Sequence, residues 1–190
     1  MRVARADGAG AQRSACVHFG NRQLPLADLH ERGARAAQSL RNAGIGSGDV
    51  IAILLYNEPA FLEAITCLRC LDAVLVLVPW HLRTAELQQV FAATGPRLVI
   101  MHTHFAVPVR AACAGLAGVR FAVVETPAET LQAFGLGTDM PIPAGAGFWR
   151  WQDLVGSSGI AIRQDAHIRA IRLAAGESVP LDVAAGRGLW

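Results

Sequence analysis

The sequence predicts an α/β protein with a doubly wound, mostly parallel sheet that carries helices on both faces. The first observation behind this prediction is a set of four apolar runs of strand length, separated by amphipathic segments: VIAILLY, AVLVLVP, RLVIM and VRFAVVE. None of the four runs alternates between apolar and polar residues, which is typical of strands that are covered on both faces. The second observation is that strands and helices follow one another with connections of only a few residues, as in right-handed βαβ units.

The N-terminal elements come first. Residues 1–15 are rich in Ala, Gly and Arg and lack periodicity, so we expect a disordered leader there. The runs VHF and RQL flank a Gly-Asn pair, which predicts a small hairpin. From Leu26 onward, apolar residues recur on one helical face. Pro25 stands at the start of this helix, and Gly44 is positioned to end it in the left-handed conformation.

The later elements alternate between strand and helix. Asn57 is expected to cap a helix over residues 59–71, and Thr84 is expected to cap the helix TAELQQVFAATG. A further helix is expected within VPVRAACAGLAG. Beyond Glu125 the periodicity fades into a loop with one short helix, and WRWQDLV predicts a helical turn.

Composition narrows the classes of protein that fit the chain. Its 190 residues suit one domain or one lobe of a larger protein. Hydrophobic residues make up 53% and charged residues 17%, and the net charge is only +2. Because the basic patch typical of nucleic-acid binding is missing, no nucleic-acid partner is expected. All seventeen cationic residues are Arg, which excludes mechanisms that need a lysine ammonium.

The same composition bears on location. The longest apolar runs fall far short of the roughly 20 residues that span a bilayer, so no transmembrane segment is expected. The N-terminal residues contain Arg but not the apolar core of a secretory signal. We therefore expect a cytoplasmic protein.

Cysteine and histidine pairs raise the question of a metal site. Cys67 and Cys70 have C-x-x-C spacing, but they fall inside a predicted helix, and no second pair supplies the two further ligands of a structural zinc. We interpret them as ordinary buried thiols in a reducing compartment. His102 and His104 alternate near a strand end without a neighbouring carboxylate or thiol, and we interpret them as surface residues. No metal site is expected.

Trp80 and His81 are the main candidates for a cofactor-binding site. They lie just beyond the strand AVLVLVP, and ligands collect at the carboxyl ends of strands in an open parallel sheet. The alternative is that Trp80 covers apolar surface while Thr84 caps the next helix, with Glu86 as a favourable first-turn acid. Because no acid, base or nucleophile stands beside them in sequence, packing is the favoured interpretation, and no catalytic residue is assigned.

A longer pattern joins these elements. The stretch that runs from LADLHERGARAAQSL through NAGIGSGDVIAILLYNEPAF to VLVPWHLRTAEL resembles the N-terminal part of the AMP-binding adenylate-forming ligases, the acyl-CoA synthetase group. Within it, VPWH is similar to the family's VPxN or VNWH segment, with Pro79 and His81 at matching positions. The resemblance extends from about Leu24 to Asp153. It implies that ATP activates a carboxylic acid as an acyl-adenylate, which is then passed to coenzyme A, with ATP, Mg and CoA as cofactors.

The resemblance also implies a phosphate-binding loop after this region, a Ser/Thr/Gly-rich run that ends in Pro-Lys-Gly. The candidate is IRAIRLAAGESVPLD, residues 168–182, which retains Gly176 and Ser178 but has Asp182 near the position of the lysine. Backbone amides and an ammonium hold phosphate oxygens, whereas a carboxylate repels them. We therefore expect a degenerate loop, no tight binding of ATP, Mg or CoA, and no activity of the isolated chain.

Three interpretations of the whole chain follow. The first is a truncated N-terminal lobe of an acyl-CoA ligase over residues 16–155, followed by a truncated or degenerate tail over residues 156–190. The second is a non-catalytic domain retained to bind a partner, and the third is a flavodoxin-like domain that binds a small ligand. The high apolar content also predicts an exposed apolar surface near the sheet edge, through which the chain self-associates.

Overall fold

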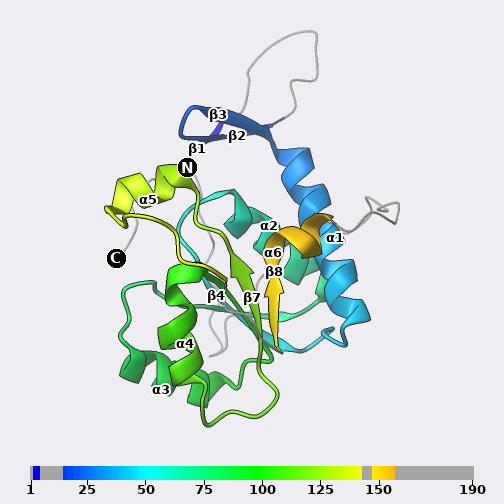
Figure 1. Cartoon of the computed structure of the whole chain (residues 1–190). Helices are drawn as coiled ribbons and strands as arrows, with labels where there is room; N and C mark the ends of the chain where they lie inside the picture. The colour runs from blue at the N-terminus through cyan, green and yellow to red at the C-terminus, as the bar shows by residue number, and fades with distance from the viewer. Residues whose placement is uncertain (1, 5–14, 143–146, 157–190) are drawn as a thin grey trace, which may run out of the picture.

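The computed structural model describes residues 2–4, 15–142 and 147–156, and its centre is a five-stranded sheet (Figure 1). In spatial order the strands are β5 (Val74–Leu77), β4 (Val50–Leu54), β6 (Leu98–His102), β7 (Arg120–Val124) and β8 (Phe148–Arg150). Every neighbouring pair is parallel. The predicted α/β fold with a mostly parallel sheet is confirmed.

Strand β4 is the first strand of this sheet in sequence, and its two neighbours lie on opposite sides of it. Helix α2 (Pro59–Leu71) leads from β4 to β5, and helix α3 (Thr84–Thr94) then leads back past β4 to β6. The strand order therefore reverses between β4 and β6. Such a topological switch point leaves a crevice beyond the carboxyl ends of the two strands, where ligands bind in open α/β sheets.

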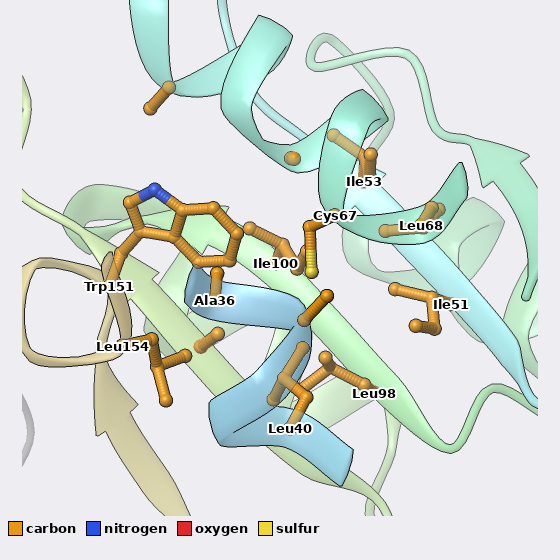
Figure 2. Close-up of a cluster of buried hydrophobic side chains, with 14 of the residues drawn as sticks. Ala36, Leu40, Ile51, Ile53, Cys67, Leu68, Leu98, Ile100, Trp151 and Leu154 are labelled. Atoms are coloured by element: carbon orange, nitrogen blue, oxygen red, sulfur yellow. The ribbon is translucent and has the colours of Figure 1, made fainter. Parts of the chain in front are cut away.

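Helices cover both faces of the sheet, as predicted. Helices α1 (Leu26–Asn42), α2 and α6 (Trp151–Gly156) contribute to a buried cluster on one face, shown in Figure 2 with Ala36, Leu40, Cys67, Trp151 and Leu154 around strand residues such as Ile51 and Ile100. Helices α3 and α4 (Ala106–Ala112) cover the other face with a second cluster that includes Phe91, Val99, Met101 and Val109. Successive residues of β6 thus point into different clusters, which explains why its sequence shows no polar alternation.

A small antiparallel sheet precedes α1. Strands β2 (Cys16–Phe19) and β3 (Arg22–Pro25) form the predicted hairpin, and Gly20 at its turn has a φ of 56°. Strand β1 (Arg2–Ala4) pairs with β2, so the expected disordered leader is wrong for these three residues. Pairing with β2 gives their backbone groups hydrogen-bonding partners, a long-range effect that local composition does not reveal.

Two predicted helix caps are wrong. Helix α2 begins at Pro59 with Glu58 at the N-cap, so Asn57 is an exposed residue outside the cap position. Helix α3 begins at Thr84, and the cap residue is Arg83, whose backbone N–H donates to Glu86 Oε2 at 2.8 Å. Glu86 therefore stabilises the first turn as expected, but Thr84 is already inside the helix. A carboxylate that reaches back to the cap amide takes the place of a capping hydroxyl.

The structure also contains a strand that the sequence did not predict. Helix α5 (Ala128–Phe134) is the expected short helix, and α6 contains most of the expected helical turn WRWQDLV. The first two residues of that turn, Trp149 and Arg150, instead belong to β8, which pairs with β7. Three residues are too few to show a hydrophobic period, so their strand conformation becomes visible only through this pairing. Residues 157–190, which include the loop candidates Gly176, Ser178 and Asp182, lie outside the described residues.

Helices α1 and α2 approach each other closely at Gly33. A Cβ atom added there would lie 2.4 Å from the carbonyl oxygen of Glu63 and 2.8 Å from Cβ of Thr66. We expect Gly33→Ala to lower the free energy of unfolding by about 1–3 kcal/mol, because the two helices must separate. This loss is expected even though alanine favours a helix over glycine by about 1 kcal/mol. Urea unfolding followed by circular dichroism measures the change.

Gly46→Ala is the matched control. A Cβ atom on Gly46 would meet nothing within 4 Å, so its replacement is expected to leave stability within about 0.5 kcal/mol of the natural chain. Equal stability of the two alanine variants would show that the close approach of α1 and α2 does not constrain the fold.

Candidate functional site

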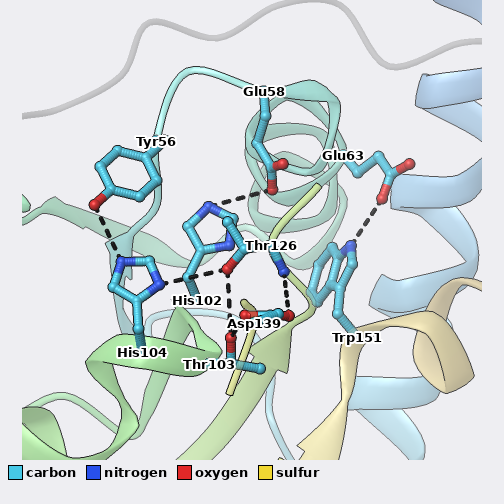
Figure 3. Close-up of polar contacts among 9 residues, drawn as sticks. All are labelled: Tyr56, Glu58, Glu63, His102, Thr103, His104, Thr126, Asp139 and Trp151. Atoms are coloured by element: carbon cyan, nitrogen blue, oxygen red, sulfur yellow. Dashed lines mark hydrogen bonds and ion pairs between the residues drawn. The ribbon is translucent and has the colours of Figure 1, made fainter. Parts of the chain in front are cut away.

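The carboxyl ends of β4 and β6 bring a group of aromatic and polar side chains to the switch point (Figure 3). Tyr56 follows β4, while His102 is the last residue of β6 and His104 lies in the short 3-10 helix after it, Thr103–Phe105. Thr126 follows β7, and Asp139 comes from the loop after α5. Residues far apart in sequence meet here because parallel strands end at the same edge of the sheet.

Tyr56 is the centre of an aromatic cluster. Its ring is nearly parallel to that of Phe134, with 4.1 Å between centroids and 20° between planes, and it stacks on His102 at 5.3 Å and His104 at 5.4 Å. Trp80 lies 5.4 Å from Tyr56 in a tilted arrangement. Tyr56 is buried, whereas Trp80 and Phe134 are 41% and 44% exposed, so the cluster opens to solvent on their side.

A hydrogen-bond network ties the loop after α5 to this edge. Asp139 Oδ2 accepts the backbone N–H of Thr126 at 2.8 Å, and Oδ1 accepts the hydroxyl of Thr103. The Thr126 hydroxyl lies 3.4 Å from His104 Nδ1, and His104 Nε2 lies 3.1 Å from the hydroxyl oxygen of Tyr56. Figure 3 shows the chain of contacts running from Asp139 through Thr126 and His104 to Tyr56.

Glu58 and His102 form a buried pair behind the aromatic cluster. Glu58 Oε1 lies 3.4 Å from His102 Nε2, and the two side chains are 1% and 0% exposed. The backbone of Val124 is within hydrogen-bonding reach of His102, and no other described residue besides the partner in the pair satisfies either side chain. The prediction that His102 is a surface residue is therefore wrong, because β6 is an inner strand of the sheet and its last residue is covered by Tyr56 and Glu58. His104 is half-buried, so the prediction that it is a surface residue is also wrong.

Burial determines the protonation of this pair. Desolvation, with a smaller contribution from the carboxylate of Glu63, raises the pKa of Glu58 to about 8. Desolvation, with a smaller contribution from His104, lowers the pKa of His102 to about 3. The pair consequently holds one proton at neutral pH, as a carboxyl group beside a neutral imidazole. An ion pair at this depth would lose more solvation energy than its attraction returns.

The sequence-predicted candidates have different positions in the structure. Trp80 belongs to the aromatic cluster. His81 is exposed, and its ring meets that of Trp80 edge to face, with 5.7 Å between centroids. Cys67 is buried and Cys70 partly buried in α2, both as free thiols, and burial raises the pKa of Cys67.

In the described part of the chain, no three His, Cys, Asp or Glu side chains are grouped so as to hold a metal ion. Within the same residues, no helix is both long and apolar enough to cross a membrane.

A cleft of about 330 Å³ lies beside the pair, between α1, the start of α2 and the end of β7. Glu58 lines it together with Arg22, Arg32, Asp28 and Glu63. Two of these groups neutralise each other, since Arg32 Nε contacts Glu63 Oε1 at 2.6 Å. The cleft therefore offers acidic groups rather than a set of free cationic donors for phosphate.

Sequence reasoning missed Tyr56, Glu58, Phe134 and Asp139 as members of this group. The position of Tyr56 and Glu58 directly after an apolar run was the available signal, because it places them at the carboxyl end of a parallel strand. Phe134 and Asp139 had no such signal, since they come from a segment without periodicity and reach the edge through tertiary contacts.

Comparisons with known proteins agree with the fold. A family model described as AMP-binding enzyme matches residues 4–136. A feruloyl-CoA synthase of Amycolatopsis sp is 35% identical over 102 residues, which are 54% of this chain and 21% of that protein. A 2-succinylbenzoate–CoA ligase of Geobacillus sp. (strain WCH70) is 31% identical over 84 residues, 44% of this chain and 17% of that protein.

Among solved structures, the acetoacetyl-CoA synthetase from Streptomyces lividans has a TM-score of 0.57 and 17% identity, and the match covers 73% of this chain and 21% of that one. At this identity the likeness shows the fold alone. The chain spans about a fifth of the length of the curated relatives it matches.

Proposed function

Because the chain belongs to the AMP-binding enzyme family, we propose that it supplies the N-terminal lobe of an ATP-dependent carboxylate–CoA ligase and does not activate carboxylates by itself. The family match over residues 4–136 carries the first half of this proposal. The relatives' names support it, since the feruloyl-CoA synthase and the 2-succinylbenzoate–CoA ligase each join a carboxylic acid to CoA. The proposed substrate is accordingly a carboxylic acid.

The second half of the proposal depends on what the described residues offer to the cofactors. When bound, ATP with Mg would activate the carboxylate as an acyl-adenylate, and CoA would provide the thiol that accepts the acyl group. The switch point presents neutral rings, the Glu58 carboxyl and the Asp139 carboxylate, and the whole chain contains no lysine. The Asp139 carboxylate opposes the binding of a triphosphate and the neutral groups supply no charge to hold one, so these residues do not fit a phosphate site. The adenylation chemistry is therefore assigned to residues outside this lobe.

ATP–pyrophosphate exchange with a panel of aliphatic and aromatic acids tests the proposal. We expect the purified chain to remain at background, because losing the electrostatic grip on a transferring group costs about two or more orders of magnitude in rate. The feruloyl-CoA synthase of Amycolatopsis sp, assayed in parallel with ferulate, confirms that the assay responds. Exchange that depends on an added acid would overturn the proposed inactivity. The coding DNA beyond Trp190 provides an independent check, since an open frame with a Thr-Gly-rich loop and its lysine supports membership of a longer ligase.

A second candidate function is that of an interaction domain. Leu77 at the end of edge strand β5 is 47% exposed, and Trp80, which follows β5 in sequence, is 41% exposed. An edge strand with apolar neighbours favours self-association. Light scattering at micromolar concentration distinguishes the two outcomes: dimers or larger species favour association, and a monodisperse monomer rejects it.

A further inference from the structure

We propose that the switch point is a binding site for an uncharged planar aromatic ring, and that the chain's own Phe134 occupies this site in the structure. The proposal concerns a site beside β4 and β6 and does not depend on the ligase function proposed above. It follows from three features of the molecule: how the ring of Phe134 is seated, how weakly its helix is anchored, and how the receiving rings are fixed.

Phe134 is seated as a bound aromatic ligand would be. Its ring lies flat against Tyr56, with 4.1 Å between centroids, and Trp80 meets it edge to face at 5.4 Å and 71°. Offset-stacked and edge-to-face contacts of this kind are the preferred arrangements of aromatic rings. Tyr56 thus provides the stacking surface of the site (its floor), and Trp80 provides the edge-to-face contact at its side (its wall). Both lie where open α/β sheets bind their ligands.

The helix that carries Phe134 is not part of the core. Helix α5 has seven residues, and Thr130 is its only buried residue. Phe134 itself is 44% exposed, and neither buried cluster includes it. The segment is held by polar contacts on either side of the ring: Glu129 pairs with Arg22 at 3.1 Å, and Asp139 accepts the backbone N–H of Thr126. The ring can therefore leave Tyr56 while both tethers remain in place.

Tyr56, on which the ring of Phe134 lies, is held in place independently of Phe134. Tyr56 stacks on buried His102, and its hydroxyl lies 3.1 Å from His104 Nε2. Burial raises the pKa of Tyr56 and lowers the pKa of His104, so both rings are neutral at pH 7. The nearest described carboxylate of the network, Asp139, is occupied by Thr103 and Thr126. The described groups that contact Tyr56 are thus uncharged rings, which suit a neutral aromatic ligand better than a carboxylate or a phosphate.

Indole is the probe for this site, and cyclohexanol, which cannot stack, is the control compound. Titrations followed by ligand-observed NMR compare the natural chain with three variants. Phe134→Ala removes the internal competitor, so its affinity for indole is expected to rise about two- to tenfold, the range that one aromatic pair supplies. Met140→Ala is the matched control, because Met140 follows α5 and is 47% exposed, and it is expected to leave the affinity unchanged.

Trp80→Ala combined with Phe134→Ala completes the test. Removing the wall is expected to reverse the gain in indole affinity, and circular dichroism verifies that each variant is folded. If Phe134→Ala raised the affinity for cyclohexanol by the same factor as the affinity for indole, the variant would have gained a nonspecific apolar cavity rather than a site for an aromatic ring. An indole affinity of Phe134→Ala equal to that of Met140→Ala, or no binding at millimolar indole, would likewise overturn the proposal.

Discussion

Replacing Trp151 by alanine is expected to lower the free energy of unfolding by about 3–5 kcal/mol, the range for deleting a fully buried large aromatic side chain. Trp151 is 0% exposed and fills the cluster between the sheet and α1 (Figure 2). Its indole Nε1 also donates to Glu63 Oε2 at 2.7 Å, while Glu63 Oε1 accepts from Arg32. The substitution thus leaves both a cavity and a buried carboxylate oxygen without its donor. Urea unfolding followed by far-UV circular dichroism measures the loss.

Two further variants separate these contributions. Trp151→Phe keeps most of the apolar ring but removes the N–H, so it is expected to cost about 1–3 kcal/mol, the penalty for a buried acceptor left without a partner. Trp80→Ala is the control, since Trp80 is 41% exposed and its removal creates no closed cavity. A loss for Trp151→Ala no larger than that for Trp80→Ala would contradict the placement of α6 against α1 and α2.

Stability is expected to fall by about 2 kcal/mol between pH 6.5 and pH 8, because of the buried Glu58–His102 pair. The pKa of Glu58 is raised from 4.5 to about 8, so the native state keeps a proton that the unfolded chain releases above pH 4.5. Stability from this group therefore decreases as pH rises through that window. The pKa of His102 is lowered from 6.5 to about 3, so below pH 6.5 the unfolded chain binds the extra proton and stability decreases as pH falls.

The two slopes cancel between pH 4.5 and pH 6.5, where the pair holds one proton in both states. The pair itself therefore adds no slope in that range, and a decline of about 1.4 kcal/mol per pH unit is expected above pH 6.5. His30 and His104 do not alter the alkaline decline, because burial lowers the pKa of each and their effects lie below pH 6.5. Urea midpoints measured from pH 5 to pH 8.5 give the profile.

Glu58→Gln tests the origin of the alkaline decline. Glutamine fills the same space, cannot ionise and can still donate to His102, so the slope above pH 6.5 is expected to disappear. Glu31→Gln is the matched control, because Glu31 is an exposed partner of Arg35 on α1 and its loss is expected to leave the slope in place. An unchanged slope in Glu58→Gln would show that another group titrates in this window.

Local sequence patterns were sufficient for most of the fold. The runs VIAILLY, AVLVLVP, RLVIM and VRFAVVE each contain a strand of the parallel sheet, since a strand buried on both faces must be apolar along its length. Pro25 and Gly44 mark the ends of α1 as expected, with Gly44 at a φ of 83°. The spaced residues that resemble the AMP-binding ligases led to the family that the comparisons identify.

Tertiary structure alone decided the rest. Strand β8 and β1 are three residues each, too short to carry a period, and they exist because β7 and β2 complete their hydrogen bonds. His102 was expected at the surface, yet it and Glu58 are buried because β4 and β6 are neighbours in space. Phe134 and Asp139 join the site through stacking and hydrogen bonds across the chain. The local sequence specifies the periodicity within one element, whereas the burial of a side chain, its pKa and the geometry of a site depend on which elements meet.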